Sequence, residues 1–144
     1  MKEKFAKTMQ FDTSSISLNL DEEEKKSQKF IDANHLIDNV NRLLAEVGIE
    51  AKAIDSFDEL KRVAPSMFVA VYESLYHNRI DEIIRAPRTL ADYERNAQVV
   101  IDHLSEQIHV DLAHITGKSI VEGNFESLSN LTHIFLRIVS LTTR

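Results

Sequence analysis

Apolar residues recur at steps of three and four along most of this chain, and this spacing limits the fold more than any other feature. In 28–47 the recurring positions include Ile31, Ile37, Val40 and Leu44. Such steps place side chains on one face of an α-helix, whereas a strand needs strict alternation. No stretch sustains that alternation. The sequence therefore predicts an all-α domain.

Local start and stop signals divide the pattern into four longer helices joined by short segments. Ser56 and Thr89 each precede an acidic residue by three positions, the arrangement of a capping box. Gly48 suits a helix end and Asn124 a helix start. Pro65 predicts the end of a short helix, because proline lacks an N–H and crowds the preceding turn. The expected long helices are 28–47, 67–78, 89–104 and 124–141. A short helix is expected at 56–65, a short helix or turn at 80–84, a short segment at 110–117, and an extended pair or a turn of helix at 120–121.

Residues 1–27 lack this spacing. They contain a serine-rich piece, 13–17, and a charged block, 21–26. Segments without a periodic apolar face at a chain terminus are commonly mobile. We therefore expect a flexible N-terminal tail at 1–27, with a docking peptide or a phosphorylated segment as the alternative, and a helical domain at 28–144.

Composition excludes several classes of protein. The chain of 144 residues has no cysteine, which removes disulfides, thiolate metal sites and cysteine nucleophiles. Its longest apolar run, 67–71, is far short of the roughly 18 residues that span a bilayer, and no secretory signal precedes it. The formal net charge of −6 disfavours a strong nucleic-acid binder. We expect neither membrane nor nucleic acid as a partner.

No arrangement of residues indicates catalysis. A triad of Ser119, His114 and Asp111 lacks the loop that would stabilise an oxyanion. His103 and His109 lie six residues apart, so a continuous helix would turn them to opposite faces. We expect no catalytic residue, no metal and no cofactor, and structural or surface roles for the histidines. The nearest approach to a metal cluster is the group Asp102, His103, His109, Asp111 and His114.

Basic residues gather in one part of the chain. Between Lys61 and Arg95 there are six basic and five acidic residues, while 28–144 as a whole carries −5. Ordinary surface charge accounts for this, but a modest basic surface on an acidic domain is the alternative. The tentative partner-binding residues are Lys61, Arg62, Arg79, Arg85 and Arg88.

Much of the chain, most clearly from its middle onward, resembles the N-terminal calponin-homology-like domains of centrosomal proteins, in the divergent group that includes kinetochore head domains and intraflagellar-transport proteins. The resemblance covers roughly 33–142 and is most specific at 114–123. The residues that carry it are Arg79, Pro87 and Arg88, the stretches 96–104, 112–117 and 120–123, and Ser127, Asn130, Leu131, Ile134 and Phe135.

This resemblance implies a compact calponin-homology-like helical fold and a non-enzymatic module that docks a protein partner. It implies a scaffold protein at the centrosome or centriole, spindle pole or cilium base, within the cytoplasm and cytoskeleton. The domain alone would be a monomer, and coiled coil in the full-length protein would oligomerise it. Direct binding of tubulin through the basic patch is the alternative function.

The resemblance also implies structural roles for individual residues. His114 and Asn96 would satisfy buried backbone groups, and Gly117 and Gly123 would permit turns. The expected core residues are Ile101, Leu104, Leu112, Ile115, Leu131 and Phe135.

Overall fold

Five α-helices make up all the regular structure in the part of the chain that the computed structural model describes, residues 14–142. The side chains of 14–23, 26, 27 and 30 are outside this description. No strand occurs among these residues, so the prediction of an all-α chain is confirmed. The helices are α1 (Ser14–Glu46), α2 (Phe57–Tyr76), α3 (Leu90–Ile108), α4 (Gly117–Val121) and α5 (Phe125–Thr142), four long and one short, as expected.

The chain divides into two units, residues 1–33 and 34–144, and α1 crosses the boundary between them. The helix begins at Ser14, so 14–27 are helical, while 1–13 lie outside the described residues. The flexible tail expected at 1–27 stays a prediction. Its charged block contains glutamate and lysine, which favour helix without needing an apolar face. The domain boundary predicted at residue 28 stays a prediction.

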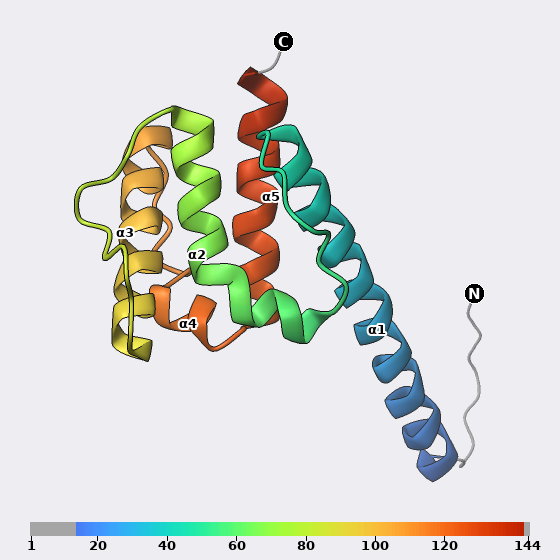
Figure 1. Cartoon of the computed structure of the whole chain (residues 1–144). Helices are drawn as coiled ribbons and strands as arrows, with labels where there is room; N and C mark the ends of the chain where they lie inside the picture. Colours follow the sequence, from blue (N-terminus) through green and yellow to red (C-terminus); the bar gives the residue numbers. More distant parts are fainter. Residues whose placement is uncertain (1–13, 143–144) are drawn as a thin grey trace. The chain divides into compact units, whose positions relative to one another are not determined.

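Helix α2 runs without interruption through Pro65, where the sequence predicted a helix end. The bend in the lower half of α2 in Figure 1 is typical of proline, whose ring displaces the preceding turn. Pro65 and its neighbour Ala64 are buried. Burial of these two residues offsets the hydrogen bond that proline cannot make. This compensation depends on tertiary packing, so the local sequence does not reveal it.

The predicted caps of the later helices are present. Thr89 Oγ1 accepts from the Asp92 N–H at 3.1 Å, and the Asp92 carboxylate accepts in return from Thr89. Asn124 Oδ1 accepts from the Ser127 N–H at the start of α5. The segments 80–84 and 110–115 are turns rather than short helices, and 120–121 belong to α4.

The core of the 34–144 unit lies among α2, α3, α4 and α5, with the last part of α1 against it. The rings of Phe68 on α2 and Phe135 on α5 stack with their centroids 5.9 Å apart. All six expected core residues are buried, which confirms that prediction.

Candidate protein-docking surface

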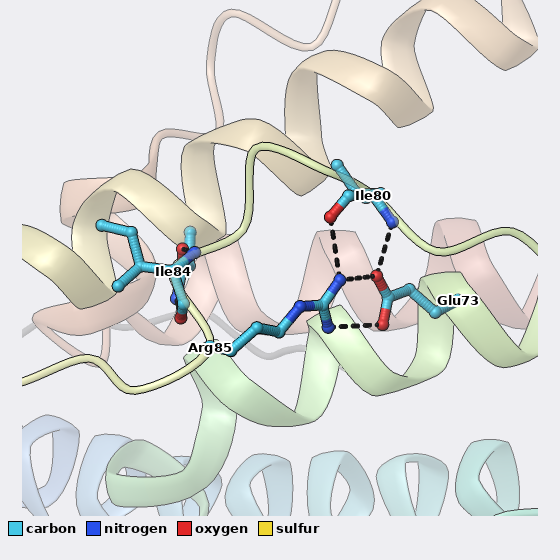
Figure 2. Close-up of polar contacts among 5 residues, drawn as sticks. Glu73, Ile80, Ile84 and Arg85 are labelled. Atoms are coloured by element: carbon cyan, nitrogen blue, oxygen red, sulfur yellow. Dashed lines mark hydrogen bonds and ion pairs between the residues drawn. The ribbon is translucent and has the colours of Figure 1, made fainter.

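The loop 77–89 joins α2 to α3 and carries three of the five tentative binding residues. One of them, Arg85, points back to α2, as Figure 2 shows. Its two terminal nitrogens donate to the two carboxylate oxygens of Glu73 at 2.9 and 2.6 Å. The guanidinium also donates to the Ile80 carbonyl at 2.8 Å, and the Ile80 N–H donates to Glu73 at 2.7 Å. These bonds fasten the loop to α2.

The electrostatics of this pair follow from its geometry. The hydrogen bonds from Arg85 hold the pKa of Glu73 below its ordinary value, with a further contribution from the Ile80 N–H and from the charge of Arg79. The same contact raises the pKa of Arg85. Two parallel bonds to one carboxylate are the arrangement that arginine's planar fork makes best. Arg85 is therefore a structural residue whose charge is largely neutralised at the surface.

Asn96 fastens the same loop to α3. Its side-chain oxygen accepts from the Ile84 N–H at 2.8 Å, and its amide nitrogen donates to the Ile84 carbonyl at 2.9 Å. Asn96 is buried, so both backbone groups of Ile84 are satisfied without water. The role expected for Asn96 is confirmed, and the loop is held at two points.

The five tentative residues are spread along α2 and the loop that follows it. Lys61 and Arg62 lie near the start of α2, whereas Arg79 follows its end. The helical rise of 1.5 Å per residue separates Lys61 from the end of α2 by about 20 Å. Lys61 is also partly engaged, because its ammonium lies 3.8 Å from Asp58 and 5.7 Å from the Phe57 ring centroid.

Three arginines of the set remain available to a partner. Arg62, Arg79 and Arg88 are exposed, and none of them forms an ion pair with a side chain that the structure describes. The partner-binding role of the set stays a prediction, now resting on these three residues.

The histidines of the candidate cluster occupy unrelated positions. His109 ends α3 with a left-handed backbone, φ 57°, while His103 lies 3.4 Å from Glu82 across the loop. His114 is exposed, so the prediction that it satisfies buried backbone groups is wrong. Among the side chains that the structure describes, no three from histidine or acidic residues gather as metal ligands would. No helix in this stretch is both long and apolar enough to cross a membrane.

An apolar groove, which the sequence analysis missed, lies in the 34–144 unit. We call it the α2 groove. Leu44, Ile49 and Ile54 line one side, and Val63 and Met67 of α2 line the other. Its volume is about 290 Å³. The available signal was at Ser66 and Ala70, where exposed positions of α2 carry small residues instead of charged ones.

Comparison with known proteins supports the resemblance over part of the chain. A family described as a domain of unknown function (DUF5745) matches residues 80–138, from the loop through most of α5. The chain is also similar to Centrosomal protein of 95 kDa from Mus musculus, 40% identical over 78 residues, or 54% of this chain. The protein of that name from Rattus norvegicus is 39% identical over 71 residues, or 49% of this chain. Each aligned stretch spans 9% of the relative's length. No solved structure matches.

Proposed function

We propose that this chain is a non-enzymatic protein-interaction module of a centrosomal scaffold protein, and that its helices form a calponin-homology-like domain. The observation that carries the proposal is the 40% identity to a centrosomal protein over 78 residues. The names of both relatives support a location at the centrosome and cytoskeleton. A place at the centriole, the spindle pole or the cilium base is the finer form of the same proposal.

The structure of the 34–144 unit suits a docking role. Its surface loop 77–89 is fixed to two helices by the Glu73–Arg85 pair and by Asn96, so little order has to be gained on binding. Arg62, Arg79 and Arg88 lie exposed outside these contacts. As proposed, the module docks one protein partner as a monomer, and coiled coil elsewhere in a full-length protein assembles the scaffold.

Proximity labelling tests this function. The chain fused to a biotin ligase is expected to label pericentriolar proteins well above the level reached by the ligase alone. A matched control is the fusion carrying Phe135→Ala, which removes a ring from the core. Labelling by the intact chain that matches the ligase alone would contradict the proposal.

Tubulin is the second candidate partner, because Arg62, Arg79 and Arg88 are exposed cations without an ion pair among the described side chains. The net charge of −6 opposes long-range attraction to an acidic lattice, so we expect weak, salt-sensitive binding. Reversal of Arg79 and Arg88 to Glu should reduce cosedimentation with microtubules, whereas Arg137→Glu on α5 should not. Equal pelleting of all three proteins would rule out this patch, and pelleting of none would rule out direct binding.

A further inference from the structure

The α2 groove is formed before any partner binds, because three hydrogen bonds hold its walls. Asn41 on α1 clamps Ile54 by donating to its carbonyl at 3.0 Å and accepting from its N–H at 2.8 Å. Glu59 accepts from the Asp55 N–H at 2.9 Å, which ties the segment before α2 to the helix. A preformed wall reduces the entropy that a partner must overcome on binding.

The shape of the groove favours a helix over a small molecule. At about 290 Å³ it lies at the lower limit of ligand pockets, so it suits one or two bulky side chains rather than a cofactor. Its α2 wall runs from Glu59 to Ala70. That wall is about 16 Å long at the helical rise, the length of three turns. Ser66 and Ala70 are small and exposed, and therefore let another backbone approach closely.

The charged residues at the rim of the groove indicate which charge the partner's side chains should carry. Lys52 is paired with Asp55 at 3.2 Å and contributes little net charge. Glu59 lies in the lining, where its charge also acts on Lys52, and Glu50 lies exposed on the neighbouring segment, so three carboxylates face one lysine. The rim is therefore acidic around an apolar floor, which complements an apolar side chain flanked by a lysine or arginine.

We propose that the α2 groove docks an amphipathic helix of a protein partner, which inserts large aliphatic side chains between Ile54 and Met67 and presents a basic side chain to Glu59. This inference rests on the proposed docking function and assigns it a surface. The groove lies before residue 80, outside the stretch that the family match covers.

Methyl NMR of the full chain with two synthetic amphipathic helices tests the proposal. One peptide has leucine on one face and lysine on the other, and the second replaces every lysine by glutamate. The leucine–lysine peptide is expected to shift the methyl signals of Val63, Met67 and Ile54, and the leucine–glutamate peptide to bind several-fold more weakly. Binding of both peptides with equal affinity would overturn the proposal that the partner presents a basic side chain to Glu59.

Two variants locate the site. Ala70→Arg places a long cation over the groove and should weaken the leucine–lysine peptide by about tenfold or more. Ala91→Arg is the matched control, since Ala91 is also an exposed helical alanine, on α3, and the change in charge is the same. Glu59→Gln keeps an oxygen for the Asp55 N–H while removing the charge, and should weaken binding several-fold. Equal effects of Ala70→Arg and Ala91→Arg would show non-specific charge binding and overturn the proposal.

Two further outcomes separate the alternatives. If the methyl signals of the groove shift with the concentration of the chain when no peptide is present, a second copy of the chain occupies the groove. That result would overturn the proposal of a partner helix. In cells, an Ala70→Arg chain that still labels pericentriolar proteins would overturn the groove while leaving the proposed function intact. Failure of the unsubstituted chain to label them would instead contradict the proposed function itself.

Discussion

Arg85 holds both carboxylate oxygens of Glu73, although twelve residues separate the two in sequence. The pair closes the loop 77–89 onto α2 and engages the charge of one of the expected binding arginines. Reversing Arg85 to probe partner binding would therefore also release the loop. Arg62, Arg79 and Arg88 are the sounder choices for that purpose.

The Glu73 contact makes stability depend on pH. Because the pKa of Glu73 is lowered in the folded chain, its contribution is present above the unfolded value of about 4.3 and is lost as pH falls through the folded value. Glu73→Gln should therefore lose less stability than the unsubstituted chain between about pH 6 and pH 3. Urea unfolding at the two pH values measures this difference, and identical losses would contradict the role of the pair.

Substitution of Asn96 should lower the free energy of unfolding, because its side chain holds the loop 77–89 to α3. Asn96→Ala leaves the partly buried N–H and carbonyl of Ile84 without their side-chain partner, which should cost about 1–3 kcal/mol of unfolding free energy. Asn130→Ala, at an exposed position on α5, should change it by no more than about 0.5 kcal/mol. Similar unfolding midpoints for the two variants in urea would refute the clamp.

Local patterns predicted the helices well where a helix buries one face, as with Leu131 and Phe135 on α5. They failed for 14–27, where a polar helix has no apolar stripe to detect, and at Pro65, where tertiary burial outweighs a local breaker. The role of Asn96 was anticipated, but its partner in the loop was not. The Glu73–Arg85 pair and the α2 groove depend on segments meeting in space, which residue spacing alone does not encode.

The packing of α5 can be tested by comparing a buried and an exposed residue of the same helix. Phe135→Ala removes a fully buried ring that stacks on Phe68, and should cost about 3–5 kcal/mol. Leu141 on the same helix is 59% exposed, so Leu141→Ala should cost less than about 1 kcal/mol. Chemical denaturation followed by circular dichroism measures both. Equal costs would show that α5 does not pack as described.

Gly117 lies where the start of α4 packs tightly against α3. Its N–H donates to the Gln98 side chain at 2.8 Å, and an added Cβ would overlap the Glu94 carbonyl oxygen. Gly117→Ala should therefore cost about 1–3 kcal/mol by overpacking. Gly48→Ala meets no neighbouring atom and strains only a left-handed backbone, at about 1 kcal/mol. A thermal melt in which Gly48→Ala is clearly the less stable variant would contradict this packing.

Imaging of the fluorescently tagged chain in cultured cells tests the central claim most directly. The docking module is expected to concentrate at the centrosome beside a pericentriolar marker, and to stay there after microtubules are depolymerised, because a scaffold partner rather than the lattice holds it. A diffuse signal from a chain shown to be folded by circular dichroism would contradict a centrosomal docking module.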